Sequence, residues 1–132
     1  MEIIEYRTYR EEDILPLYAS VGWTAYTGAP DALRRGFEKS LLTLAAYEGK
    51  TLVGLARTVG DGETVVLVQD LLVFPQYQRL GVGTALLRAV MERFADVRQL
   101  QLVTDDTKKT LAFYHSLGLR ELSAFGCRGF MR

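Results

Sequence analysis

The sequence contains very little of the chemistry that builds disulfides and metal sites. Among its 132 residues there is one cysteine, Cys127, and one histidine, His115. A single cysteine cannot form a disulfide within the chain, and one imidazole with one thiol gives poor support to a Cys–His nucleophile pair or a tetrahedral metal site. We therefore expect no metal. With 48% hydrophobic residues, the chain can bury a single-domain core over residues 1–132 without such cross-links.

The sequence also lacks an excess of charge of one sign and any long hydrophobic run. Its 16 basic and 16 acidic residues cancel, so no overall field attracts nucleic acid or an anionic membrane. No apolar run approaches the roughly 18 residues that span a bilayer. Residues 1–5 lack the basic region and apolar stretch of a secretory leader. We expect a cytoplasmic protein with neither a nucleic-acid nor a membrane partner.

Apolar and turn-forming residues indicate a mixed order of strands and helices. Strands are predicted for residues 3–9, 42–48, 52–59, 64–73, 100–103, 119–123 and 128–131, and helices for residues 11–22, 30–41, 84–94 and 109–117. Three hairpin-linked strands form an antiparallel meander, and the later strand, loop, helix and strand form a right-handed crossover with a parallel pair. We expect an α/β (α+β) fold: a mixed, mostly antiparallel sheet with a splayed parallel pair and helices on both faces.

Residues 73–84, Val-Phe-Pro-Gln-Tyr-Gln-Arg-Leu-Gly-Val-Gly-Thr, carry the most functional information. A strand leads into them and a helix leaves them, so Arg79, Gly81 and Gly83 lie where backbone N–H groups are unpaired at a helix N-terminus, and glycines allow close approach. This combination suits a phosphate or pyrophosphate. A Walker loop needs a lysine that is absent here, and Leu86 stands where a dinucleotide fingerprint has its third glycine or alanine.

The order Val73-x-Pro75, then Gln78-x-x-Gly81-x-Gly83, then an amphipathic helix resembles the acyl-coenzyme A signature of the GCN5-related N-acetyltransferases, the GNAT family. The resemblance implies the GNAT fold and acetyl-coenzyme A as co-substrate. The pantetheine arm would pair with the strand at Leu72 and Val73, in a cleft at the splayed strands. The cofactor residues implied at the loop are Gln78, Arg79, Leu80, Gly81, Val82, Gly83 and Thr84. A purely structural role of the glycines would not explain the residues around them.

A second segment, Phe113-Tyr114-x-x-x-Gly118, resembles the late Phe-Tyr-x-x-x-Gly-Phe segment of the same family. The resemblance places Tyr114 near the sulfur of the cofactor, where a phenol of pKa near 10 can donate a proton to the departing thiolate. Tyr114 is our candidate general acid; its alternative is packing on the apolar face of the helix. Relatives often have Asn seven residues earlier, where this chain has Thr107, the candidate contact to the cofactor arm.

Asp70 is the candidate base, because it lies three residues before Val73 on the strand that lines the proposed cleft, and relatives often have an acidic residue on this strand. Its carboxylate would draw the proton of the amine through water. The alternative is a structural aspartate that caps or pairs with Arg57 on the adjacent strand. His115 follows Tyr114 directly on a helix and so points about 100° away. We expect His115 to be exposed and non-catalytic.

Trp23 and Tyr26, in the segment of residues 21–30, are the candidate acceptor-binding residues. They either close over an amine or aromatic substrate or pack onto the core. The leading function is transfer of acetyl from acetyl-coenzyme A to a primary amine of a small molecule or peptide, directly within a ternary complex. The alternative is a non-catalytic acyl-coenzyme A sensor or protein-interaction module. The predicted hairpin of residues 119–131 would be either internal or paired across a homodimer.

Overall fold

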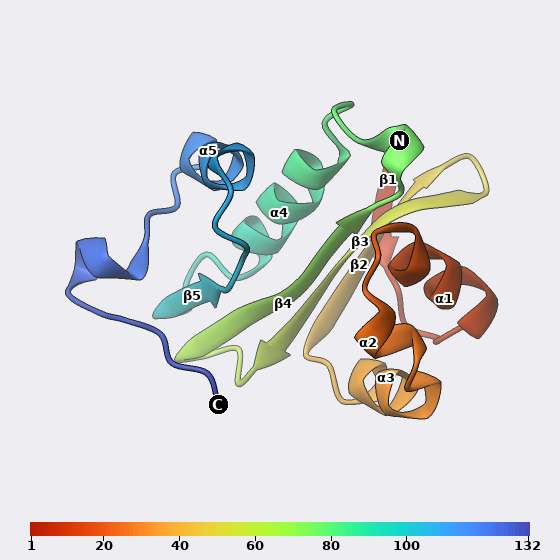
Figure 1. Ribbon diagram of the computed structural model, residues 1–132, viewed down its shortest axis with the longest axis horizontal. Helices are drawn as coiled ribbons and strands as arrows, with labels where there is room; N and C mark the ends of the chain where they lie inside the picture. The colour runs from red at the N-terminus through yellow and green to blue at the C-terminus, as the bar shows by residue number, and fades with distance from the viewer.

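The computed structural model describes residues 1–132 and contains one five-stranded sheet (Figure 1). Its strands lie in the order of the chain: β1 (Glu2–Glu5), β2 (Leu42–Glu48), β3 (Thr51–Gly60), β4 (Val65–Val73) and β5 (Gln99–Leu102). The pairs β1–β2, β2–β3 and β3–β4 are antiparallel, and β4–β5 is parallel. The predicted meander and the predicted parallel pair are both confirmed.

Helices cover both faces of this sheet, as predicted (Figure 1). One face carries α1 (Glu11–Ser20), α2 (Thr24–Thr27) and α3 (Pro30–Glu38), and the other carries α4 (Val82–Arg93) and α5 (Lys108–Ser116). On the first face, the helices pack on the sheet through a hydrophobic core that includes Ile14, Phe37 and Leu55. The second core joins residues such as Val53 of β3 to Leu86 of α4. No helix is long and apolar enough to cross a membrane.

The parallel pair separates halfway along β4. Its register runs from Val65 opposite Gln99 to Val68 opposite Leu102, whereas β4 continues to Val73. On the other side, Arg57 of β3 is opposite Asp70 while its neighbour Thr58 is opposite Val68. One residue of β4, Gln69, is therefore extra at this point, a β-bulge that bends the strand where β5 ends. The edge of β4 beyond Val68 has no strand beside it.

The predicted terminal hairpin is wrong. In place of strands at residues 119–123 and 128–131 there is a 3₁₀ turn at Leu122–Phe125, closed by Gly126 with a φ of 73°. Its hydrogen bonds are local, because the N–H of Ala124 donates to the carbonyl of Glu121 at 3.0 Å. Alternating apolar residues define a strand only when a partner strand is present, and the 94% exposed Phe130 has none. The homodimer stays a prediction.

Three smaller predictions also need correction. The first strand ends at Glu5 instead of residue 9, and the segment between the first two predicted helices contains the unpredicted short helix α2. In α3 the predicted apolar stripe is present at Leu33 and Phe37, which are buried. Leu41 lies beyond the end of this helix and is 38% exposed. Two of these differences fall at element ends, where boundaries are least well defined, and the third is a single helical turn in a connecting segment.

Candidate functional site

The loop before α4 presents a run of unpaired backbone donors. The N–H groups from Arg79 to Thr84 donate to no group of the protein, and the first bond of this turn runs from the N–H of Ala85 to the carbonyl of Gly81 at 3.0 Å. Arg79 and Gly81 have positive φ values of 64° and 86°. This alternation turns successive N–H groups toward one side, at the positive end of the helix dipole. The arrangement fits an anionic group such as a pyrophosphate.

The two glycines of this loop have different reasons to be there. Gly81 needs its left-handed backbone conformation, which side chains disfavour. At Gly83, a Cβ would meet the ring of Phe113 at 3.6 Å and Val73 at 3.8 Å, both ordinary contact distances. Packing within the protein therefore does not require glycine at position 83. Close approach of a ligand to the backbone does provide a reason for it.

The side chains of this loop differ in their contacts and exposure. The amide of Gln78 donates to the carbonyl of Val73 at 3.1 Å and so ties the loop to the end of β4. Gln78 thus shapes the loop, and its predicted place near the pyrophosphate stays a prediction. Leu80 is 70% exposed and Val82 is buried in the core beneath α4. The side chains of this loop that can donate to an anion are the Arg79 guanidinium and the Thr84 hydroxyl.

The free edge of β4 lies directly upstream of this loop. The Leu72 side chain is buried in the core under α1, and Val73 packs toward α4. Their side chains are thus occupied on the two faces of the sheet. The N–H of Phe74 donates to the carbonyl of Val53 on β3, so by alternation the backbone groups of Leu72 also face β3, and those of Val73 face the gap left by β5. This is the geometry required to bind an extended amide-containing chain as an added strand.

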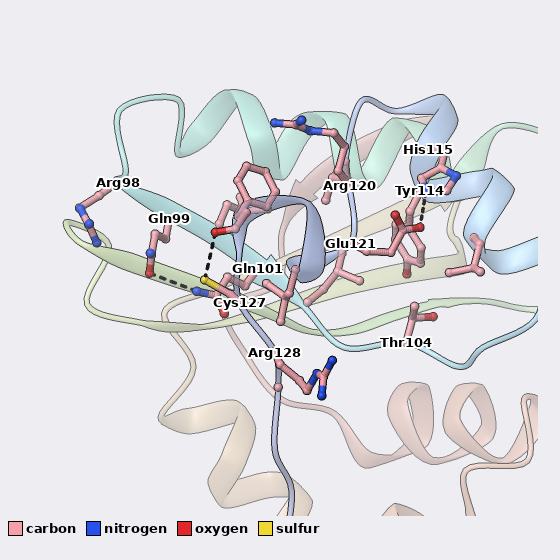
Figure 2. A pocket seen from close by; sticks show the side chains of 17 residues that line it. Arg98, Gln99, Gln101, Thr104, Tyr114, His115, Arg120, Glu121, Cys127 and Arg128 are labelled. Atoms are coloured by element: carbon pink, nitrogen blue, oxygen red, sulfur yellow. Dashed lines mark hydrogen bonds and ion pairs between the residues drawn. The ribbon is translucent and has the colours of Figure 1, made fainter.

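Tyr114 lies on α5, where it lines a cavity of about 670 Å³ together with Thr104 (Figure 2). Its ring is half-buried and packs edge-on against Phe113, with 5.0 Å between ring centres. Burial raises the pKa of Tyr114, and the Thr104 hydroxyl opposes this shift. Tyr114 is therefore a protonated phenol at neutral pH, both packed on its helix and open to a cavity. The predicted packing of its ring on the helix is confirmed, and its role as general acid stays a prediction.

Thr107 and His115, at the two ends of α5, make local contacts. The Thr107 hydroxyl caps the helix by accepting from the N–H of Thr110 at 3.2 Å, and it donates to Asp105 at 2.9 Å. Its predicted contact with the cofactor arm remains a prediction. His115 is exposed, as expected, and its ring contacts the carboxylate of Glu121 (Figure 2).

Asp70 is the centre of a buried polar network. Its side chain has no exposed surface, and its Oδ2 accepts from the Arg57 guanidinium at 2.7 Å and from the Tyr18 hydroxyl at 2.6 Å. Its Oδ1 accepts from the Tyr26 hydroxyl at 3.2 Å, and that hydroxyl accepts from the Gln69 amide at 3.2 Å. The structure therefore shows the predicted alternative in which Asp70 pairs with Arg57. Whether Asp70 also serves as a base stays a prediction.

The surroundings of Arg57 and Tyr18 hold both side chains in their proton-donating forms. Burial lowers the pKa of Arg57, but the charge of Asp70 and its hydrogen bond outweigh this and hold the pKa above its ordinary value. Burial and the Asp70 charge raise the pKa of Tyr18, so this hydroxyl stays a donor. The sequence did not single out Tyr18, because its spacing from Ile14 on an amphipathic helix is equally typical of a core residue.

The candidate acceptor residues line a second cavity, of about 580 Å³, between α2 and β4. Trp23 is 36% exposed, and its ring centre lies 5.9 Å from that of Tyr26. The residues that line the cavity are Gly22, Trp23, Thr24, Ala25, Tyr26, Leu67, Val68, Gln69, Asp70, Val103 and Met131. The structure thus brings Trp23, Tyr26 and Asp70 together, while Tyr114 lines the other cavity. Met131, far away in the sequence, had no signal that pointed to this site.

No three or more His, Cys, Asp or Glu side chains come together as a group that could hold a metal ion. The polar features of the site are instead the backbone donors at α4, the phenol of Tyr114 and the Asp70 network. Backbone donors, phenols and buried ion pairs are groups with which proteins in general bind anions, donate protons and position charges.

Proteins named as acetyltransferases are among those similar to this chain in sequence and fold. A GNAT-family acetyltransferase from Streptococcus pneumoniae TIGR4 matches with a TM-score of 0.89 and 38% identity, over 99% of this chain and 96% of that one. The chloroplastic GCN5-related N-acetyltransferase 2 of Arabidopsis thaliana is 34% identical over 84 residues, which are 61% of this chain and 31% of the relative. An N-acetyltransferase from Thermoplasma acidophilum in complex with coenzyme A shares the fold, with a TM-score of 0.68, 17% identity and 89% of each chain covered.

The extent of these matches shows the family. The chain spans between 31% and 63% of the length of the curated relatives it matches, so their substrates and partners do not carry over. Residues 6–119, however, match the family model described as the acetyltransferase (GNAT) family. The chain therefore belongs to the GNAT family of acyl-coenzyme A-dependent acetyltransferases.

Proposed function

We propose that this protein transfers the acetyl group of acetyl-coenzyme A to a primary amine, directly within a ternary complex. The observation that carries the proposal is the run of unpaired N–H groups from Arg79 to Thr84, next to the free edge of β4. The loop binds the pyrophosphate, and the backbone of β4 at Val73, next to Leu72, binds the pantetheine amides as an added strand. Family membership supports the same assignment.

Tyr114 is proposed as the general acid of the transfer. Acetyl-coenzyme A supplies the acyl group: a bond forms from the amine nitrogen to the thioester carbonyl carbon, and the carbon–sulfur bond breaks with its electrons on sulfur. The phenol of Tyr114 then gives its proton to that sulfur. Because burial raises the pKa of Tyr114, the phenol is fully protonated at neutral pH and can act as the donor.

The amine must lose its proton, and Asp70 is proposed as the charge that draws it. The carboxylate is shielded from solvent, so it acts through the Tyr26 hydroxyl or a water molecule. Trp23 and Tyr26 are proposed to contact the acceptor, which is a small-molecule or peptide amine. The location in the cytoplasm is retained from the sequence as part of this proposal.

One observation favours the alternative of a non-catalytic acyl-coenzyme A sensor. Asp70 already has an ion-pair partner and two hydroxyl donors, so the second cavity contains no free carboxylate. A sensor would bind the cofactor through the same loop and turn over no amine. The two functions therefore share the donor site and differ in chemistry.

Two measurements test the proposal. Acetyl-coenzyme A is expected to raise the melting temperature in a concentration-dependent manner, while desulfo-coenzyme A lacking the acyl group serves as the binding control. Release of free thiol in the presence of a panel of amines then separates enzyme from sensor. No thermal shift would refute the cofactor site, and a shift without thiol release from any amine would favour the sensor.

A further inference from the structure

We infer that the cavity between α2 and β4 takes a primary amine with a single positive charge and a flat, apolar body. This inference rests on the proposed acetyltransferase function and narrows its acceptor from any primary amine to one chemical class. Three features of the cavity carry it: its charge, its aromatic wall and the position of one hydroxyl group.

The cavity has only one charged residue, Asp70, and an ammonium can be joined to it only at Oδ1, through the Tyr26 hydroxyl. Of the 11 residues that line it, Asp70 is the only aspartate, glutamate, lysine, arginine or histidine. Its Oδ2 is held by Arg57 and Tyr18. An acceptor with several ammonium groups would place the second one among apolar atoms with no counter-charge, and desolvation of an unpaired charge is costly. Polyamines and other polycationic acceptors are therefore disfavoured.

The walls of the cavity suit a flat apolar body. The planes of the Trp23 and Tyr26 rings are inclined to each other by only 31°. The ring of Tyr18 packs against both, with its centre 6.0 Å from that of Trp23 and 5.1 Å from that of Tyr26. Val103 and Met131, which are 69% and 85% exposed, form further apolar lining. Stacking on aromatic faces and burial of this exposed apolar surface both favour an aromatic or cyclic amine.

The Tyr26 hydroxyl is the group placed to receive the ammonium. It donates to Asp70 Oδ1 and accepts from the Gln69 amide. An ammonium N–H that replaces this amide as the donor would be joined to the buried carboxylate through one hydroxyl. Arg57 and Tyr18 act here as positioning residues, because they hold Asp70 still from the opposite side.

Selectivity between amines is the first test. With acetyl-coenzyme A saturating, kcat/KM for phenethylamine is expected to exceed that for spermidine by about tenfold or more, equivalent to about 1.4 kcal/mol. A lysine-containing basic peptide is expected to fall below phenethylamine as well. Equal or better turnover of spermidine would overturn the inference. A failure of acetyl-coenzyme A to bind at all would instead refute the proposed function.

Tyr26→Phe is the second test, since it removes the hydroxyl and keeps the ring. KM for phenethylamine is expected to rise about tenfold, with KM for acetyl-coenzyme A unchanged. Tyr47→Phe on β2, outside the cavity, is the matched control and should change neither constant. An unchanged amine KM in Tyr26→Phe would contradict the assigned role of the hydroxyl.

Binding can also be observed without turnover, because Trp23 is the only tryptophan of the chain. In the protein saturated with coenzyme A, phenethylamine is expected to change the tryptophan fluorescence saturably, and spermidine at the same concentration is not. This readout needs no variant. A saturable response to spermidine alone would overturn the inference.

Discussion

The donor side and the acceptor side of this protein satisfy their polar groups in opposite ways. At the start of α4, the N–H groups from Arg79 to Thr84 have no partner within the protein. Around Asp70, by contrast, every oxygen of the carboxylate has a partner, supplied by Arg57, Tyr18 and Tyr26. The donor side is thus incomplete without a ligand, whereas the acceptor side is stable without one.

This difference predicts how ligand binding and stability respond to substitutions on each side. Substitutions in the loop are expected to weaken ligand binding and leave stability largely intact. Substitutions in the Asp70 network are expected to reduce stability first, since they leave a buried charge without a partner. The following experiments test this difference between the two sides, beginning with the largest expected effect.

Arg57→Met is expected to have the largest effect. It leaves Asp70 buried without its cation, so the free energy of unfolding should fall by about 3–5 kcal/mol, measured by urea denaturation. The double variant Arg57→Met with Asp70→Leu removes both charges and should recover a large part of this loss. If the single variant were as stable as the parent protein, the acceptor side would not depend on this ion pair.

Tyr114→Phe is expected to reduce kcat by about a hundredfold, because the departing thiolate loses its proton donor. Acetyl-coenzyme A binding, followed by thermal shift, should be unchanged, since the ring and its packing against Phe113 are retained. Tyr77→Phe, in the 3₁₀ turn after β4, is a matched control that keeps kcat. Full activity of Tyr114→Phe with every acceptor would refute its role as the acid.

Gly83→Ala should separate binding from stability on the donor side. A methyl group here meets its neighbours at ordinary contact distances, so stability should be unchanged or rise by up to about 1 kcal/mol from helix propensity. The methyl would stand between the ligand and the backbone, and the Kd of acetyl-coenzyme A should rise about tenfold. Calorimetric titration and urea denaturation measure the two quantities. Gly36→Ala, in α3, is the control that should leave the Kd unchanged.

The pH dependence of kcat gives the smallest expected change. Burial raises the pKa of Tyr114, so the phenol stays protonated up to its ordinary pKa of about 10 and loses its proton only above it. With both substrates saturating, kcat should therefore not fall between pH 7 and about pH 10. A fall centred near pH 8 would identify a different group as the acid.

Much of the donor site could be predicted because its parts are contiguous. The strand, Pro75, the glycines and the following helix occupy consecutive positions, so local backbone rules apply. The parallel pair of β4 and β5 also follows from the order of the elements. The exact use of Gln78, which binds the carbonyl of Val73, depends on the bend of the chain and was not visible in the pattern.

The acceptor site was predicted only in fragments. Trp23 and Tyr26 stood out as aromatic residues in a glycine-containing segment, but nothing in the sequence connected them with Asp70, 44 positions after Tyr26. The pairing of Asp70 with Arg57 was one of the two predicted alternatives. Choosing it requires the register between β3 and β4, which the sequence does not give. The terminal hairpin failed for a related reason, since a strand pattern does not specify its partner.

From the sequence alone followed the order of the five strands of the sheet, the glycine loop at the start of α4 and the resemblance to a family that uses acetyl-coenzyme A. Only the tertiary structure decided that Asp70 is shielded by Arg57 and Tyr18, and that Trp23, Tyr26 and Met131 share one cavity. The physical reason is how far apart in the sequence the interacting residues lie. Backbone donors at a helix start are set by neighbours along the chain, whereas a buried charge acquires its partners only when distant elements pack together.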